Sequence, residues 1–461
     1  MLRRDGATTT EDVRAPSRAG SVVAPPHVFR LIECESPASL PARSCLRGLE
    51  EVTFGRTSER SAEVTGRTLA LGLPDRFLST AHARLHRTET GWLLQDLGSK
   101  NGTLVGGARI QERLLEDGDL FEVGRTLMLF RASLPSAPSA PVHLEAAALA
   151  PQESALLTLD PAHEAALQRL RAVAPSKLSV LVTGESGTGK ELAAAALHAL
   201  SGRTRPLVAV NCAALAPTLL ESQLFGHRKG AFSGANDDAP GLVRASDRGT
   251  LFLDEIGELP PPAQAALLRV LAEGQVLPVG GTAAVPVDLR VVCATNRDLK
   301  AMVAAGTFRG DLLARLQGFV LELVPLRERL ADLGLLVSAL LRRHAPEPDA
   351  VRFEPEAARA LARHRWPFNV RELDQTLASA LLLAGSHPIA LTHLPAELRE
   401  ATVAPPKATL APEEQELRAR LVALFVEHAG NMSAVARVMG KGRTQIVRWV
   451  QRFGIDPLRP R

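Results

Sequence analysis

One glycine-rich stretch of the sequence combines residue types that can hold phosphate groups. An apolar run over 178–182 is followed by Gly184-Glu-Ser-Gly-Thr-Gly-Lys190, and a helix-forming run over 191–200 comes next. Glycines at this spacing let successive backbone N–H groups point at one spot, where the start of the new helix and the ammonium group of Lys190 add positive charge. The stretch therefore predicts a phosphate cradle between a strand and a helix.

The spacing of this stretch is the Walker A pattern, with Glu191 where Ser or Thr usually follows the lysine. The residues predicted to contact the nucleotide are Gly184, Glu185, Ser186, Gly187, Thr188, Gly189, Lys190 and Glu191. A second stretch, Gly249-Thr-Leu-Phe-Leu-Asp254-Glu255, has the pattern of a buried strand that ends in two carboxylates. We expect Asp254 to hold Mg²⁺ and Glu255 to polarise an attacking water. Together the two stretches predict hydrolysis of ATP.

Composition limits the kind of protein that carries these motifs. The chain has 461 residues and a formal net charge of +4, which is enough length for about three domains. Its four cysteines are far apart and form no Cys-x-x-Cys pair, which argues against a zinc site or a disulfide scaffold and for a reducing compartment. No apolar run reaches membrane-spanning length, and the first residues lack the apolar segment of a signal peptide. The sequence therefore predicts a cytoplasmic protein with no membrane partner.

Hydrophobic periodicity divides the chain into three candidate domains. Alternating strand and helix patterns in the middle of the chain predict a parallel sheet with helices on both faces. The predicted order is a disordered N-terminus (1–27), a small antiparallel β domain (28–133), a Pro/Ser linker (134–150), an α/β domain with a helical lid (151–400, lid from about 327), a second linker (401–415) and an all-α domain (416–461).

Three short clusters stand out in the β domain: Gly55-Arg56, Ser79-Thr80-Ala81-His82 and Asn101-Gly102-Thr103. In this order they resemble the forkhead-associated (FHA) domain, a β-sandwich whose loops bind phosphothreonine peptides. The resemblance implies that Arg56, Ser79, Thr80 and Asn101 bind the phosphopeptide and that His82 braces the loops.

The phosphate ligand of this domain has an alternative. Because the interval between Arg56 and Ser79 is long, Arg67 could take the role of Arg56. The partner implied is a phosphothreonine-containing protein, either a Ser/Thr kinase or its substrate.

A run of small residues around one phenylalanine occurs at Gly230-Ala-Phe232-Ser-Gly-Ala235. Such a run suits a loop tip that presents one apolar contact to a partner. It closely resembles the GAFTGA loop of the bacterial sigma-54-dependent transcription activators, which are AAA+ ATPases, and Glu191 also matches the Walker A stretch of that family. The resemblance implies contact with sigma-54 RNA polymerase through Gly230, Ala231, Phe232, Ser233, Gly234 and Ala235.

The same resemblance assigns roles around the nucleotide. Asn211 would orient Glu255, and Thr295 with Asn296 would sense the γ-phosphate. From the helical lid, Arg371 would contact the nucleotide. The cofactors implied are ATP and Mg²⁺.

Two arginines match the finger positions of the family. Arg309 and Arg315 would reach the γ-phosphate of the neighbouring subunit and stabilise charge in the transition state. This role requires a homo-oligomer, which in this family ranges from a dimer to a hexameric ring.

The run over 430–449 predicts two helices joined by a glycine turn, with Ser433 as the N-cap of the first helix. It resembles the Fis-type helix-turn-helix that ends the same family, and the DNA donors implied are Arg443, Thr444, Gln445 and Arg448. From Arg418 to Arg461 nine Lys or Arg residues stand against two acids. The predicted partner is double-stranded DNA at upstream activator sites.

The fold class predicted is therefore multidomain: a β-sandwich, an α/β AAA+ ATPase with a lid, and an all-α helix-turn-helix. The predicted function is ATP-dependent transcription activation, in which the protein remodels sigma-54 RNA polymerase under control of phosphothreonine recognition. The alternative is a phospho-dependent scaffold whose AAA+ domain acts on a non-transcriptional client.

Overall fold

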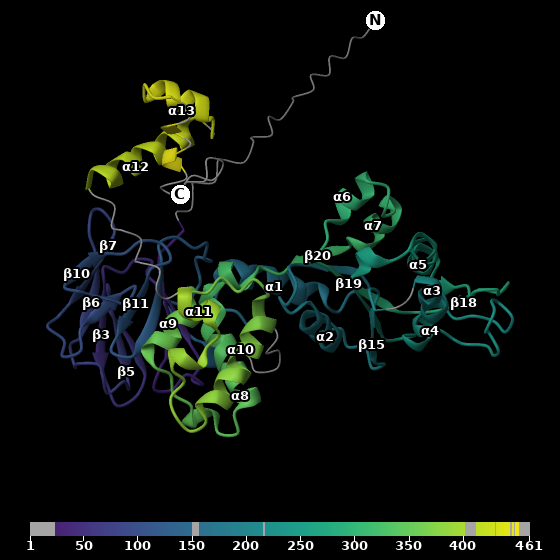
Figure 1. Cartoon of the computed structure of the whole chain (residues 1–461), viewed down its shortest axis with the longest axis horizontal. Helices are drawn as coiled ribbons and strands as arrows, with labels where there is room; N and C mark the ends of the chain where they lie inside the picture. Colours follow the sequence, from purple (N-terminus) through teal and green to yellow (C-terminus); the bar gives the residue numbers. More distant parts are fainter. Residues whose placement is uncertain are drawn as a thin grey trace, which may run out of the picture. The chain divides into compact units, whose positions relative to one another are not determined.

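The computed structural model describes residues 24–149, 156–214, 217–401, 412–428, 430–442, 445–446 and 448–450. Two compact units are present, Met1–Ala401 and Thr402–Arg461, and each is treated by itself. Most of the N-terminal segment predicted as disordered (1–27) lies outside the described residues, as does most of the predicted 401–415 linker. Figure 1 colours the chain from purple at its start to yellow at its end.

Two sheets form an N-terminal β-sandwich. Its strands are β1 (His27–Glu33), β2 (Ala42–Cys45), β3 (Glu51–Arg56), β4 (Ser61–Thr65), β5 (Thr68–Leu73), β6 (Ala83–Arg87), β7 (Trp92–Asp96), β8 (Thr103–Val105), β9 (Ala108–Ile110), β10 (Glu112–Leu114), β11 (Leu120–Val123), β12 (Thr126–Arg131) and β13 (His143–Glu145). One sheet has the order β13-β2-β1-β12-β11-β8-β9 and the other β10-β7-β6-β3-β5-β4. Phe54, Phe121 and Phe130 are fully buried in the core between the sheets. The predicted β-sandwich is confirmed.

Two features of the sandwich differ from the prediction. β3 and β5 pair in parallel, so the domain is not purely antiparallel. The linker predicted over 134–150 contains β13, which pairs with β2. The backbone groups on the outer edge of β2 would otherwise be unpaired, and a three-residue strand is enough to cover them.

A five-stranded parallel sheet forms the centre of the α/β domain. Its strands are β14 (Val180–Thr183), β15 (Leu207–Asn211), β16 (Thr250–Asp254), β19 (Arg290–Thr295) and β20 (Phe319–Glu322), in the order β15-β16-β19-β14-β20. Alternate residues of β16 enter different cores: Leu251 and Leu253 face one cluster, and Phe252 faces the other. The sheet is therefore buried on both faces, as a parallel sheet requires.

Helices pack on both faces of this sheet. They are α1 (Pro161–Val173), α2 (Lys190–Leu200), α3 (Pro217–Phe225), α4 (Leu242–Ala245), α5 (Pro261–Glu273), α6 (Leu299–Ala304) and α7 (Gly310–Leu316). Leu170 of α1 and Leu197 of α2 pack with Phe252, whereas Leu267 of α5 and Leu312 of α7 pack on the opposite face. A short strand pair, β17 (Gln275–Val276) with β18 (Val285–Pro286), follows α5.

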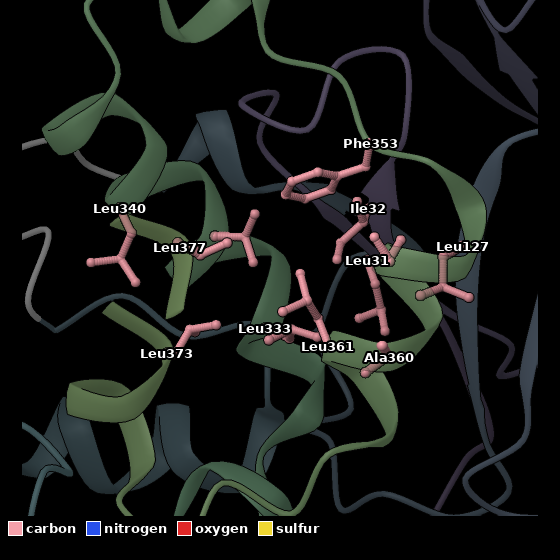
Figure 2. Close-up of a cluster of buried hydrophobic side chains, with 14 of the residues drawn as sticks. Leu31, Ile32, Leu127, Leu333, Leu340, Phe353, Ala360, Leu361, Leu373 and Leu377 are labelled. Atoms are coloured by element: carbon pink, nitrogen blue, oxygen red, sulfur yellow. The ribbon is translucent and has the colours of Figure 1, made fainter. Parts of the chain in front are cut away.

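The lid is a group of helices that follows the parallel sheet. They are α8 (Leu333–His344), α9 (Pro355–Arg363), α10 (Asn369–Ala384) and α11 (Ala396–Ala401), drawn in green to yellow-green in Figure 1. Their buried side chains share one cluster with residues of β1 and β12 (Figure 2). The predicted helical lid is confirmed, whereas its contact with the sandwich is not indicated by the sequence pattern.

The second unit contains α12 (Pro412–Glu427) and α13 (Met432–Val438). Phe425, Val435 and Ile446 are fully buried in its core. The cap of α13 is Asn431, whose side chain accepts hydrogen bonds from the backbone N–H groups of Ser433 and Ala434. The prediction of Ser433 as the cap was wrong, because the helix begins one residue before Ser433.

The residues that the structure describes contain neither a membrane-spanning helix nor a disulfide bond. No helix among them is long and apolar enough to span a membrane. Each of the four cysteines is buried and unbonded to another cysteine.

Candidate functional site

The predicted phosphate loop connects β14 to α2. Gly187 and Gly189 have φ values of 78° and 100°, a region that favours glycine. At Gly187 an added Cβ would overlap the backbone carbonyl of Phe368 in the lid. Lys190, the first residue of α2, donates from Nζ to the carbonyl oxygens of Gly184 at 3.0 Å and Glu185 at 3.2 Å. The loop therefore curls around the ammonium group, as a phosphate cradle requires.

Strand register brings the predicted polar residues to the edge of the sheet beside this loop. Asn211 lies opposite Asp254 in the β15–β16 pair, and Thr295 lies opposite Thr183 in the β14–β19 pair. Burial lowers the pKa of Lys190, while the nearby charges of Glu255 and Asp254 act in the opposite direction. The two carboxylates are therefore within electrostatic reach of the lysine.

Glu255, Asn211 and Thr295 at this edge differ in backbone conformation, hydrogen bonding and burial. Glu255 has a φ of 51°, an uncommon conformation for a residue other than glycine and one that marks a sharp turn after the strand. The Oδ1 of Asn211 accepts a hydrogen bond from the N–H of Ala213 at 2.9 Å, and no hydrogen bond joins it to Glu255 in the described structure. Thr295 is fully buried, whereas Asn296 next to it is exposed.

The carboxylates fit a magnesium ion that arrives with a nucleotide. Among the described residues, no group of three or more His, Cys, Asp or Glu could form a metal site by itself. Mg²⁺ needs only one or two carboxylates when phosphate oxygens and waters complete its coordination. Asp254, at the end of β16, is the residue placed to supply one.

The lid contacts the phosphate loop through residues that the sequence analysis missed. Arg327 pairs with the Glu185 carboxylate at 2.6 and 2.7 Å. The Nδ2 of Asn369 donates to Glu185 at 3.1 Å and to the carbonyl of Ser186 at 3.0 Å. These partners lower the pKa of Glu185 to about 2. The side chain of Glu185 therefore binds the lid in this structure, although its position in the loop predicted a nucleotide contact.

Arg371 lies close to the same loop. Its guanidinium donates to the Ser186 hydroxyl at 3.1 Å, which fits the predicted nucleotide contact from the lid. Asn369 is fully buried with a φ of 55°, a conformation for which Asn is enriched. The sequence signal for Asn369 is its place two residues before Arg371 at the start of α10.

Of the two candidate arginine fingers, Arg309 directly precedes α7 and Arg315 lies on the exposed side of this helix. Leu312 and Leu316 anchor this helix in the core, and the backbone N–H of Arg309 donates to Gln264 of α5 at 2.9 Å. The Arg309 guanidinium pairs with Asp311 at 2.7 Å, and Arg315 is exposed. Within the described residues, neither guanidinium bonds to the phosphate loop of its own chain.

The loop around Phe232 is joined by a hydrogen bond at its base, and its tip is exposed to solvent. The N–H of Gly230 donates to the carbonyl of Ala235 at 2.9 Å, which closes the loop. Phe232 is 38% exposed, and its ring meets the edge of the His227 ring with centroids 5.0 Å apart. His227 shares a 2.7 Å hydrogen bond with Ser222 of α3. One exposed aromatic ring on a closed loop of small residues can serve as a contact for a partner protein.

The FHA-like clusters meet at one end of the sandwich. Arg56 ends β3 with an exposed side chain, and its N–H donates to the carbonyl of Ser79 at 3.0 Å. The Ser79 hydroxyl accepts from the N–H of Lys100 at 3.1 Å. Asn101 donates from Nδ2 to the carbonyl of Phe77 at 2.7 Å. The structure thus brings Arg56, Ser79 and Asn101 together, with Thr80 exposed beside them.

The remaining residues of this region fall into two groups. His82 is fully buried, accepts from the N–H of Ser79 and donates to the carbonyl of Gly102, which fits its predicted bracing role. Arg67 precedes β5 and pairs with Glu50, at the opposite end of the parallel β3–β5 pair from Arg56. The alternative in which Arg67 replaces Arg56 therefore lacks support from the geometry.

The predicted DNA donors are described only in part. Arg443 and Thr444 lie outside the described residues. Arg448 is exposed and Gln445 is half-buried, on a segment whose Ile446 and Val450 are buried in the core of the second unit. This arrangement leaves Arg448 available to a partner.

Three family models match successive parts of the chain. They are the sigma-54 interaction domain over residues 156–322, the AAA+ ATPase lid domain over 327–410 and the FHA domain over 52–124. These matches agree with the predicted sandwich, ATPase domain and lid.

Relatives and a solved structure are each similar to about two thirds of the chain. Regulatory protein AtoC of Escherichia coli (strain K12) is 40% identical over 314 residues, which is 66% of this chain and 68% of AtoC. The acetoin catabolism regulatory protein of Cupriavidus necator is 42% identical over 317 residues, but only 47% of its length is covered. The crystal structure of NtrX from Brucella abortus in complex with ADP is 31% identical, with a TM-score of 0.51 over 65% of this chain and 70% of NtrX.

The match to the sigma-54 interaction domain covers both the nucleotide site and the Phe232 loop. The chain belongs to the sigma-54-dependent transcription activators, with an FHA domain and an AAA+ ATPase domain.

Proposed function

We propose that the protein binds upstream DNA, assembles into a ring and uses ATP hydrolysis to make sigma-54 RNA polymerase open its promoters. The observation that carries this proposal is an exposed Phe232 on the same domain as Lys190, Asp254 and Glu255. RNA polymerase as the target places this activity in the cytoplasm.

The residues at the edge of the sheet have separate roles in ATP hydrolysis. Lys190 and the loop N–H groups bind the phosphates, and Asp254 would hold Mg²⁺, which neutralises phosphate charge when bound. Glu255 orients the attacking water and accepts its proton. Thr295 and Asn296 sense whether the γ-phosphate is present.

The fingers complete the site from a second subunit. Arg309 and Arg315 are exposed, and within the described residues neither guanidinium bonds to its own phosphate loop, so we propose that they reach the γ-phosphate of the adjacent copy. Hydrolysis then depends on assembly of a homo-oligomer, up to a hexameric ring.

The chain offers a short connection from the nucleotide to the Phe232 loop. Asn211 ends β15 beside Asp254, and α3 follows it and leads to Ser222 and His227. We propose that a change at Asn211 on loss of the γ-phosphate moves α3 and raises Phe232 toward sigma-54.

The FHA loops are the proposed input. A phosphothreonine carries about two negative charges, which Arg56, Ser79 and Asn101 can meet with charge-assisted hydrogen bonds. We expect Arg56→Ala to abolish binding of a phosphothreonine peptide, while ATPase activity of the assembled protein stays intact. Arg67→Ala is the matched control and should bind as the wild type does. Fluorescence anisotropy against an oriented phosphothreonine peptide library measures both, and loss of binding in Arg67→Ala alone would reverse the assignment.

The second unit is the proposed DNA-binding domain. Its candidate contacts are Arg443, Thr444, Gln445 and Arg448, in the second helix of a Fis-type helix-turn-helix.

Footprinting on genomic DNA tests the proposed function as a whole. We expect protected sites upstream of sigma-54 promoters, and we expect protection to weaken in Arg448→Ala. Binding of the intact chain to no genomic site, combined with normal ATPase activity, would favour the alternative of a phospho-dependent scaffold with a non-transcriptional client.

A further inference from the structure

The sheet that contains β1 and β12 is buried on both of its faces. Val28 and Met128 face the core of the sandwich, whereas Leu129 belongs to the cluster shared with the lid. Leu31 and Leu127 face the lid in the same cluster (Figure 2). All seven residues of β1 are buried. A sandwich sheet needs only one buried face, so the second apolar face of this sheet is built to receive another element.

The lid side of this contact is fitted to the strand. Leu333, Phe353 and Leu361 of the lid lie against Leu31 and Ile32 in the same cluster (Figure 2). At Gly334 in α8 an added Cβ would overlap the carbonyl oxygen of Leu31 and approach Pro41 to 3.0 Å. Glycine within a helix is destabilising relative to alanine. Its presence here is explained by the close approach of α8 to β1.

Hydrogen bonds and an ion pair fix the position of the lid on the sheet. The Ser338 hydroxyl donates to the carbonyl of Ala38 at 2.7 Å, and the N–H of Phe353 donates to the carbonyl of Cys34 at 2.8 Å. Arg359 of α9 pairs with Glu122 of β11 at 2.9 Å. Burial raises the pKa of Glu122 to about 7, against the effect of Arg359. The contact is thus specific as well as apolar.

Arg125, directly before β12, contacts the loop over 74–82, and this loop hydrogen-bonds to both Arg56 and Asn101. Asn101 bonds to the carbonyl of Phe77, whose ring lies under the Arg125 guanidinium at 3.9 Å. Arg125 pairs with Glu35 at 2.9 Å, and its N–H donates to Asp75 at 2.7 Å. Arg125 immediately precedes β12, and Glu35 lies in the segment that the lid contacts at Cys34 and Ala38. The loops that hold Arg56 and Asn101, here called the peptide loops, are therefore connected to the lid through a series of contacts that runs by way of Arg125 and Glu35.

At its other side the lid holds the phosphate loop. The N–H of Val370 donates to the carbonyl of Gly187 at 3.0 Å, and the guanidinium of Arg329 donates to the carbonyl of Thr188 at 3.2 Å. With the bonds of Asn369 and Arg327 to Glu185, these contacts tie the conformation of the loop to the position of the lid.

We propose that the outer face of the β1–β12 sheet is the docking surface for the lid, and that docking couples the peptide loops of the FHA domain to the phosphate loop. The coupling of a peptide to the ATPase rests on the proposed phosphothreonine recognition, whereas the docking surface does not. A lid held on the sheet keeps Asn369 and Val370 on the phosphate loop, so the FHA domain sets nucleotide affinity through the lid. By linkage, a ligand of the loops and a nucleotide then change each other's affinity by the same factor.

Gly334→Ala in the full-length chain is the test of docking. The alanine favours the helix itself but cannot fit against Leu31, so only the contact is opposed. We expect faster hydrogen exchange at the amide of Phe353 and weaker binding of a fluorescent ADP, by about fivefold or more. Ala339→Leu, which adds bulk at an exposed position of α8, is the matched control and should change neither quantity.

Arg125→Gln tests the connection to the peptide loops, with Arg67→Gln as its control at the other end of the sandwich. We expect Arg125→Gln to weaken ADP binding in the same direction as Gly334→Ala and Arg67→Gln to leave it unchanged. Unchanged exchange at Phe353 in Gly334→Ala would overturn the docking surface. Faster exchange without a change in ADP affinity, or an unchanged affinity in Arg125→Gln, would overturn the coupling. Because no phosphopeptide is used, a failure of phosphothreonine recognition cannot be mistaken for either result.

Discussion

Arg309→Ala and Arg315→Ala are each expected to lower ATP turnover by about 10³-fold or more, the effect typical of losing an arginine finger. Both side chains are exposed, Arg309 just before α7 and Arg315 on it, and neither bonds to the phosphate loop of its own chain within the described residues. Nucleotide affinity should change little, because Lys190 and the loop are untouched. Turnover is measured under steady-state conditions at concentrations where the protein is assembled. Lys300→Ala, on the exposed surface of neighbouring α6, is the control and should turn over as the wild type does.

Mixing of variants tests whether the fingers act between subunits. Lys190→Ala cannot hold phosphates but keeps its arginines, and Arg309→Ala keeps its lysine. Each variant is expected to be inactive by itself. A mixture should regain part of the activity, at interfaces where the intact Lys190 of one subunit meets the intact Arg309 of its neighbour. A mixture that stays inactive although it assembles would contradict action in trans.

Phe232→Ala is expected to keep ATP hydrolysis but to lose the action on sigma-54 RNA polymerase that hydrolysis drives. The ring is the one aromatic group in a loop of small residues and does not touch the nucleotide site. ATPase activity and DNA binding should remain within about twofold of the wild type, while binding to sigma-54 falls below detection, since a central aromatic contact can carry much of an interface's energy. Leu382→Ala, which removes another highly exposed apolar side chain from the lid, is the control. Normal transcription by Phe232→Ala would contradict the proposed role of the loop.

Much of the nucleotide site could be predicted from the sequence, because its residues lie in short local motifs. The positions of Gly184, Lys190, Asp254 and Thr295 depend on strand ends and a glycine turn, and parallel strands bring such ends to one edge. The contacts of Glu185 could not be predicted in the same way. Its carboxylate is bound by Arg327 and Asn369 of the lid, more than 140 residues away in the sequence, and no periodic pattern encodes such a distant pairing.

The contact between sandwich and lid was missed for a similar reason. A strand buried on both faces has a nearly continuous apolar pattern, as in Leu31-Ile32 or Leu127–Phe130, which indicates burial but not the element that causes it. Gly334 within a helix was a usable signal, since a helical glycine often marks a close approach. The sequence alone left Arg56 and Arg67 as alternatives for the proposed phosphate contact, and the parallel β3–β5 pair places the two residues at opposite ends.

Open-complex formation on a supercoiled sigma-54 promoter tests the central claim most directly. The purified protein is mixed with sigma-54 RNA polymerase and either ATP or a non-hydrolysable analogue, and melted promoter DNA is detected with permanganate. We predict melting with ATP, none with the analogue and none when sigma-54 is replaced by another sigma factor. Rapid ATP hydrolysis by the assembled protein with no promoter melting, at concentrations that bypass the need for upstream DNA, would contradict the account.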